Sequence, residues 1–279
     1  LVVNYLIIKL GDLMPSYPIS GAGLGLRRTL LGPLSSVTAD DINFMEVAPE
    51  NWMNVGGRLG KHFRSFTERF DFLCHGLSLS IGSPDPLDID FVKQVAEFMK
   101  LHDIKAYSEH LSYCSNDGHM YDLMPIPFTE EAVHYVADRI RTVQDIIEQP
   151  LIIENVSAYA QPGKEMEEID FLKAVVEEAD CRILLDVNNV FVNSTNHGFD
   201  AKDYLKKIPT ERISYLHIAG HYEEAEDLLV DTHGATIKQS VWDLLDFTYQ
   251  QHGVIPTLLE RDFNIPDVDE LMVEVNLIK

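Results

Sequence analysis

The chain is poor in basic residues and in cysteine. Only 22 lysines and arginines stand against 45 aspartates and glutamates in 279 residues, which gives a formal net charge of -23. Proteins that bind nucleic acid or anionic membranes hold phosphates with many Lys and Arg side chains, so this deficit argues against both partners. The three cysteines, Cys74, Cys114 and Cys181, form no C-x-x-C pair. A disulfide framework, a zinc ribbon and an iron–sulfur cluster are therefore not indicated, and a cytoplasmic location is expected.

Long hydrophobic runs and flexible linkers are also missing. The apolar run over residues 1–9 is too short to span a bilayer, and it lacks the basic lead-in and small-residue cleavage site of a signal peptide. From Ile19 onward, no Pro/Gly/Ser-rich stretch or charge block divides the chain. We therefore expect an N-terminal extension over residues 1–18 and a single domain over residues 19–279.

Short apolar runs alternate with longer amphipathic segments throughout this domain. Between the runs, Asp88 and Thr129 are placed as N-caps of helices with one apolar face. Apolar strands separated by amphipathic helices indicate a parallel sheet that is covered on its faces. Eight such units in about 250 residues predict an α/β fold, the (β/α)8 TIM barrel. The candidate strands are residues 21–26, 43–48, 72–77, 105–110, 151–155, 182–189, 215–219 and 257–262.

An open, doubly wound sheet is the alternative fold. It is disfavoured because no G-x-G-x-x-G motif opens a helix after a strand. Gly21, Gly23 and Gly25 instead alternate along one strand, where they would leave one face bare for backbone or ligand to approach.

Polar side chains recur at the C-terminal ends of the candidate strands. Each one alone is compatible with a solvated loop residue or a hydrogen-bonded core group. Seven at the same place in the pattern favour a functional site, because barrel active sites are built at that face. These residues are Glu46, His75, His110, Glu154, Asp186, His217 and Glu260.

The acidic members of this set require positive charge nearby. Glu154, Asp186, Asp231 and Glu260 would raise one another's pKa on converging, so they could not all stay ionised unaided. Other basic residues of the strands lie at strand starts, the opposite end of the barrel, which leaves Arg261 as the expected nearby base. Metal ions are the simpler source of charge, and histidine with carboxylate but no thiolate suits iron, manganese or zinc.

The expected ligands divide into two firm sites and a third. Glu154 would bridge two ions, with His75 and His110 completing one site. The second site would use Asp186, His217 and Glu260, and the third would use Asp231 and His233 with Asn189 or His221. Asparagine is a weak neutral ligand, and His221 is as well placed to support another ligand or contact a substrate as to bind the ion itself.

This ligand order resembles that of the xylose isomerase-like barrels, and especially the trinuclear zinc site of endonuclease IV, which has a histidine at the position of Asn189. Local motifs narrow the resemblance: Glu46-Val-Ala-Pro-Glu-Asn51, Ser108-Glu-His-Leu-Ser112, Leu185-Asp-Val-Asn-Asn189, His217-Ile-Ala-Gly-His221, Asp231-Thr-His-Gly234 and Glu260-Arg-Asp262. From about Ile19 to the end, the chain resembles the multinuclear non-haem iron-dependent oxidative enzymes. That family, once catalogued as domain of unknown function 692, includes the catalytic subunit of methanobactin biosynthesis.

The resemblance implies a function and a set of site residues. It implies two or three iron ions of mixed valence, O2 as oxidant, and a cysteine-containing, ribosomally synthesised precursor peptide as substrate. A small partner protein would present the leader of that peptide. The implied metal ligands are His75, His110, Glu154, Asp186, Asn189, His217, His221, Asp231, His233 and Glu260. Supporting or substrate-contacting roles would fall to Glu46, Asn51, Asn155 and Arg261.

Two other functions stay open at this point. One is a zinc- or manganese-dependent hydrolase or isomerase of the same barrel class, which would work without O2. Its phosphodiester-cleaving form is disfavoured because the sequence has no basic stripe. The other is a non-catalytic metal-binding protein, in which protein ligands would fill every coordination position.

Overall fold

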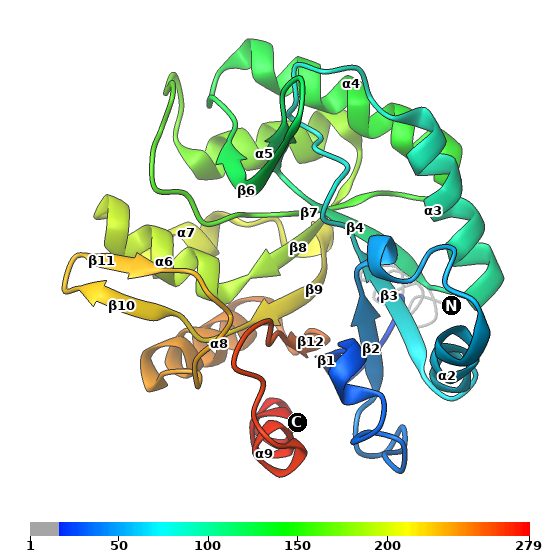
Figure 1. Ribbon diagram of the computed structural model, residues 1–279. Coiled ribbons are helices and arrows are strands. Elements are labelled where there is room, and N and C mark those ends of the chain that lie inside the picture. The colour runs from blue at the N-terminus through cyan, green and yellow to red at the C-terminus, as the bar shows by residue number, and fades with distance from the viewer. Residues whose placement is uncertain (1–16) are drawn as a thin grey trace, which may run out of the picture.

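The computed structural model describes residues 17–279, so the apolar run over residues 1–9 and most of the expected N-terminal extension lie outside the described residues. Eight strands close into a barrel in the order β1-β12-β9-β8-β7-β4-β3-β2, with helices around it (Figure 1). Every pairing around the barrel is parallel. The predicted (β/α)8 barrel is confirmed.

The bounds of the elements are as follows. The barrel strands are β1 (Ala22–Gly25), β2 (Phe44–Val47), β3 (Asp71–His75), β4 (Ala106–His110), β7 (Ile152–Glu154), β8 (Arg182–Asp186), β9 (Ile213–Ile218) and β12 (Thr257–Leu259). The α-helices are α2 (Gly57–Thr67), α3 (Ile89–His102), α4 (Glu130–Ile147), α5 (Glu168–Ala179), α6 (Val187–His197), α7 (Ala201–Lys207), α8 (Gln239–His252) and α9 (Val268–Ile278). Short 3-10 helices are η1 (Arg28–Leu30), η2 (Pro49–Asn51) and η3 (Thr210–Arg212).

Two connections contain hairpins that the sequence analysis does not predict. β5 (Ser112–Ser115) pairs with β6 (His119–Pro125), and β10 (Tyr222–Ala225) pairs with β11 (Leu228–Val230). Both hairpins follow barrel strands, β4 and β9, so they stand on the C-terminal face of the barrel (Figure 1). No helix within residues 17–279 has both the length and the apolar character needed to cross a membrane.

The helix termini show how local sequence sets the element boundaries. Asp88 and Thr129 accept hydrogen bonds from the backbone N–H groups of Phe91 and Ala132, which confirms both expected N-caps. The expected strand over residues 182–189 is too long, because β8 ends at Asp186 and α6 begins at Val187. The Asp186 carboxylate caps α6 by accepting from the N–H of Asn189, which turns the chain out of the barrel wall.

A separate apolar layer fills the barrel interior. Its members are buried: one comes from each barrel strand except β1, and one lies three residues before β1. They are Ile19, Phe44, Leu73, Ala106, Ile152, Leu184, Tyr215 and Leu258. The remaining buried apolar residues form a larger cluster, to which both strands and helices contribute. The barrel is therefore packed below its mouth, as barrels of this size require.

Two glycines of β1 make room for side chains of other residues. A Cβ on Gly23 would lie 2.4 Å from the Phe44 ring, so the missing side chain is replaced by that ring in the apolar layer. A Cβ on Gly25 would lie 3.3 Å from the Arg27 guanidinium. The bare face expected for this strand is thus occupied by neighbouring side chains.

We expect Gly23→Ala to lower the free energy of unfolding by about 1–3 kcal/mol, because the added methyl group overpacks the interior against Phe44. Gly32→Ala is the matched control, since a Cβ there meets nothing within 4 Å. Urea unfolding followed by circular dichroism compares the two variants. Equal stabilities would show that the interior layer yields without cost.

Candidate metal centre

A polar layer lies directly above the apolar layer of the barrel. Alternate residues of a strand face the same side, so the residue two positions after each interior apolar residue also points inward. These positions hold Glu46, His75, Ser108, Glu154, Asp186, His217 and Glu260. All seven are buried. His110 lies one further step up β4, closer to the mouth.

The donor atoms of this layer gather into three groups. Within each group, one potential ligand atom per residue lies within 4.8 Å of the others. The groups are His75, His110 and Glu154; Glu154, Asp186 and His217; and Asp186, His233 and Glu260. Glu154 and Asp186 each belong to two groups, so the three sets form one continuous cluster across the barrel mouth.

The first group joins strands β3, β4 and β7. The Nε2 atom of His75 lies 3.0 Å from Oε2 of Glu154 and 3.1 Å from Nε2 of His110. The same Glu154 oxygen lies 3.5 Å from Nε2 of His110. The parallel register causes this proximity, because His110 pairs directly with Glu154 across β4 and β7.

The other groups are centred on His217 and Glu260. The Nδ1 atom of His217 lies 2.9 Å from Oε2 of Glu260 and 4.0 Å from Oδ2 of Asp186. His233, in the loop after β11, places Nδ1 3.3 Å from the same Glu260 oxygen. The register accounts for the proximity of His217 and Asp186, because these two residues are partners across β8 and β9.

Several of these buried atoms make no well-directed hydrogen bond, even where another polar atom lies at contact distance. Buried polar atoms in folded proteins are almost always paired, so a convergent set of unpaired ones needs an explanation. All three groups contain such atoms, and a bound cation would satisfy their lone pairs. The unpaired atoms are Nδ1 of His110 and His217, Nε2 of His221 and His233, Oε2 of Glu154 and Glu260, Oδ2 of Asp186 and Oδ1 of Asn189.

The electrostatics of the cluster show the same need for positive charge. Burial alone would lower the pKa of His75, but the Glu154 carboxylate outweighs it and raises that pKa to about 9. Burial, assisted by the charge of His75, lowers the pKa of His110 to about 4. Burial together with Glu154 raises the pKa of Asp186 well above its usual range. Without a metal, protons shared among these groups must supply the charge that the carboxylates require.

The second half of the cluster follows the same pattern. Burial would lower the pKa of His217, yet Glu46 and Glu260 on its two sides raise it well above the usual range. Burial would also lower the pKa of His233. Asp231 and Glu260 outweigh this effect and raise that pKa well above its usual range. The two imidazoles in turn hold the pKa of Glu260 well below its usual range against the effect of burial.

Three expected ligands border the groups without joining them. Asp231 places Oδ1 2.7 Å from Nε2 of His233 and accepts hydrogen bonds from Asn188 and Ser157. His221 stacks on Phe191, and its Nδ1 bonds to the Asn188 amide oxygen. Asn189 donates to Glu154 at 3.1 Å, which leaves its own amide oxygen unpaired. A third site built on Asp231 therefore remains a prediction.

The positive side chain beside the cluster is Arg27 rather than Arg261. Arg27 Nε donates to Asp262 at 3.0 Å, and its NH2 group lies 3.7 Å from Oε1 of Glu260. Arg261 turns away and pairs at 2.6 Å with Glu274 of α9. The sequence reasoning missed Arg27 because it lies past the end of β1 and outside the expected ligand pattern.

The remaining expected supporting residues have distinct positions. Asn155 exchanges two hydrogen bonds with the backbone of Asp186, which ties the ends of β7 and β8 together. Glu46 accepts from His217 inside the barrel. Asn51 is exposed on η2, where its carbonyl accepts from Arg28. Asp262, also missed, bonds both Arg27 and Nδ1 of His233.

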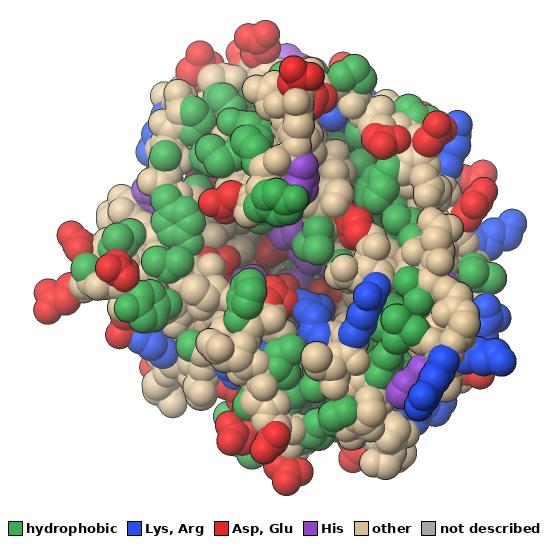
Figure 2. All heavy atoms as spheres, viewed as in Figure 1, with side chains coloured by type: hydrophobic (Ala, Val, Ile, Leu, Met, Phe, Trp, Pro, Cys, Tyr) green, Lys and Arg blue, Asp and Glu red, His purple; other side chains and the backbone are tan. Residues whose placement is uncertain are grey.

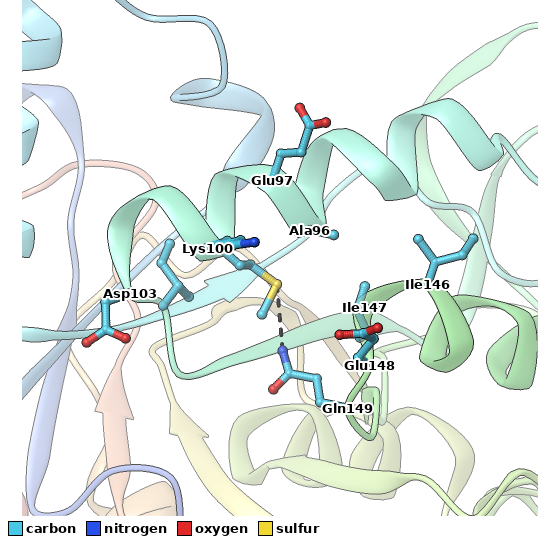
Figure 3. A pocket seen from close by; sticks show the side chains of 10 residues that line it. Ala96, Glu97, Lys100, Asp103, Ile146, Ile147, Glu148 and Gln149 are labelled. Carbon is cyan, nitrogen blue, oxygen red and sulfur yellow. Dashed lines mark hydrogen bonds between the residues drawn. The ribbon is translucent and has the colours of Figure 1, made fainter.

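The mouth is the chemically distinctive hollow of the molecule. Figure 2 shows acidic, histidine and basic side chains gathered at the centre of the face that carries both hairpins. A separate cavity of about 560 Å³ lies between the C-terminal ends of α3 and α4 (Figure 3). Its lining includes Ile146, Ile147 and Gln149, and it shares no residue with the donor groups. The candidate metal centre therefore lies at the mouth and not in that cavity.

Known structures share the fold of this chain. A 3-keto-D-glucoside 4-epimerase from E. coli superposes with a TM-score of 0.60 at 11% identity, covering 91% of this chain and 97% of the other. Endonuclease IV from Thermus thermophilus gives a TM-score of 0.59 at 14% identity, covering 92% and 97%. At these identities the likeness shows the xylose isomerase-like barrel and nothing of the activity.

Sequence relatives are much more similar. UPF0276 proteins of Shewanella sediminis and Pseudomonas aeruginosa are 64% and 57% identical over 256 and 261 residues. The alignments cover 92% and 94% of this chain and 92% of each relative. Residues 21–279 also match a family described as RiPP precursor modification enzyme MbnB/TglH/ChrH, where RiPP denotes a ribosomally synthesised and post-translationally modified peptide. The chain therefore belongs to this family of RiPP precursor modification enzymes.

Proposed function

We propose that the chain is an iron-dependent, O2-using enzyme that oxidatively modifies cysteine residues of a ribosomally synthesised precursor peptide. The observation that carries the proposal is the convergence of three donor groups with unpaired lone pairs in a member of a peptide-modifying family. Histidine and carboxylate donors without thiolate suit iron, and also manganese or zinc. Bound iron would supply the redox chemistry that side chains lack.

No cysteine of the chain contributes a thiolate to the cluster. Cys74, Cys114 and Cys181 are all buried, and none belongs to a donor group. A cysteine thiolate delivered by a peptide would therefore be a thiolate ligand that the donor groups themselves lack. This supports a substrate cysteine as the group on which the chemistry acts.

The exposure of the donors indicates the side from which a substrate approaches. The side chains of His110 and His233 are each 13% exposed, whereas those of Asp186 and His217 are fully buried. The outer donors would therefore meet the substrate, and the inner ones would hold and orient the ions. The buried apolar layer beneath excludes water from below.

The loops around the mouth fit a peptide better than a small polar molecule. Four large apolar side chains that follow different barrel strands are between 45% and 66% exposed: Leu77, Tyr159, Tyr222 and Phe263. Exposed aromatic and aliphatic groups are typical of peptide and protein interfaces. A small partner protein that presents the peptide leader also belongs to the proposal.

We expect a cysteine-containing peptide encoded beside the gene, when co-expressed with this protein, to show an O2-dependent mass shift. His110→Ala should lower bound iron and product formation by about tenfold or more, because a donor of the first group is removed. His134→Ala is the control, since that histidine is 61% exposed and pairs with Glu178 on the outer surface. Anaerobic metal analysis, Mössbauer spectroscopy and mass spectrometry are the measurements.

Zinc as the sole metal, with activity that needs no O2, would overturn the proposal. It would favour the hydrolase or isomerase alternative. Full iron occupancy without any peptide modification would favour a non-catalytic metal-binding protein.

We also expect metal uptake to release protons and to strengthen as pH rises towards about 9. In the absence of metal, the raised pKa of His75 keeps its ring protonated below that value, so the ion must displace a proton. The apparent affinity should therefore rise with pH in this range and level off above it. Calorimetric titration with Mn²⁺ in buffers of different ionisation enthalpy counts the protons. An affinity that does not change as the pH rises towards about 9 would contradict the assignment of His75 as a donor.

A further inference from the structure

A continuous hydrogen-bonded chain runs across the barrel beneath the donor groups. Nδ1 of His75 lies 2.8 Å from the Ser108 hydroxyl, which lies 2.7 Å from the Tyr215 hydroxyl. The Tyr215 hydroxyl donates to Oε2 of Glu46 at 2.7 Å. The same Glu46 oxygen lies 3.2 Å from Nε2 of His217. All five residues are buried, with exposures between 0% and 5%.

The Glu46 carboxylate sets the direction of every hydrogen bond in this series. A carboxylate only accepts hydrogen bonds, so both Tyr215 and His217 must donate to Glu46. The Tyr215 hydrogen is then committed, and the contact between Ser108 and Tyr215 requires Ser108 to donate. A second acceptor for Ser108, the Cys74 carbonyl, is farther away at 3.2 Å. The Ser108 oxygen is left to accept from Nδ1 of His75.

The chain therefore fixes which nitrogen of each ring carries a hydrogen. His75 holds one on Nδ1, and its Nε2 faces Glu154 and His110 in the first donor group. His217 holds one on Nε2, and its Nδ1 faces Glu260 and Asp186. In both rings the nitrogen free to bind a metal is the one that points into the cluster.

We propose that Glu46 is a positioning residue that sets the tautomers of two histidines in different donor groups. It acts on His217 directly and on His75 through Tyr215 and Ser108. The inference rests on the metal binding of the proposed function, but it does not depend on iron, O2 or a peptide. A single anion thereby couples ligands that come from β3 and β9, on separate parts of the barrel wall.

The geometry predicts an unequal effect of cutting the chain. Tyr215→Phe removes one hydroxyl, so His75 loses its directional constraint while His217 keeps its bond to Glu46. Glu46→Gln disturbs both rings, because an amide can also donate. Loss of such supporting hydrogen bonds typically weakens metal binding by about 10–100-fold.

A second buried tyrosine provides the matched control. Tyr107 is 0% exposed, like Tyr215, and its hydroxyl donates to a buried glutamate, Glu109, at 2.5 Å. Tyr107 belongs to the outer core cluster, whereas Tyr215 belongs to the interior layer. Tyr107→Phe thus removes a comparable buried hydrogen bond without touching the chain to His75.

The test uses Zn²⁺ as a diamagnetic probe on the full-length protein. Nitrogen-15 NMR of the imidazoles in the zinc-loaded protein reports which ring nitrogen carries hydrogen, and competition with a chelator gives the affinity of each site. For Tyr215→Phe we expect one site weakened by about 10–100-fold, a changed His75 signal and an unchanged His217 signal. Glu46→Gln should change both signals, and Tyr107→Phe neither.

Wild-type zinc affinity together with an unchanged His75 signal in Tyr215→Phe would overturn the inference. If that variant fails to fold, as judged by circular dichroism, Ser108→Ala cuts the same chain next to His75 and must give the same result. Because zinc is redox-inert, a failure of peptide oxidation leaves this measurement intact. The tautomer assignment and the proposed function can therefore fail separately.

Discussion

The arrangement of this protein depends on burying carboxylates and imidazoles together above an apolar layer. Moving an unpaired ion out of water costs several kcal/mol even after relaxation, so such a cluster persists only with compensating charge. Without a metal, protonation of His75, His217 and His233, whose pKa values are raised, would supply part of that charge, and Arg27 borders the cluster from one side. The unpaired lone pairs that remain are those a metal ion would take. The need for cations thus links the electrostatics of the mouth to its chemistry.

The barrel turns this requirement into a defined geometry. Each barrel strand except β1 contributes an apolar residue to the interior layer and, two positions later, a polar residue to the layer above it. The closed register then places Glu154 beside His110 and Asp186 beside His217. Rigid strands hold the inner donors, while His233 comes from a loop and is more exposed. This division leaves the outer side of the cluster accessible to a peptide, while the inner donors stay fixed on the strands.

Sequence reasoning reached most of the strands and the polar residues at their ends, because strand periodicity and capping are properties of short segments. It placed the end of β8 too late, because Val187 and Val190 suit a strand as well as a helix until the Asp186 cap is seen. It missed Ser108 and Tyr215, although each lies two residues before an expected histidine ligand. Serine and tyrosine carry no metal-binding signal of their own, so only their place in the polar network reveals their role.

The sequence by itself determined the (β/α)8 fold, the acidic character of the chain, and the strand ends at which histidines and carboxylates occur. Only the tertiary structure decided how those residues are grouped, that Arg27 rather than Arg261 lies beside them, and that Glu46 reaches His217. The reason is that spacing along a strand is local, whereas contacts between residues as far apart as 46 and 217 depend on how all eight strands close in register.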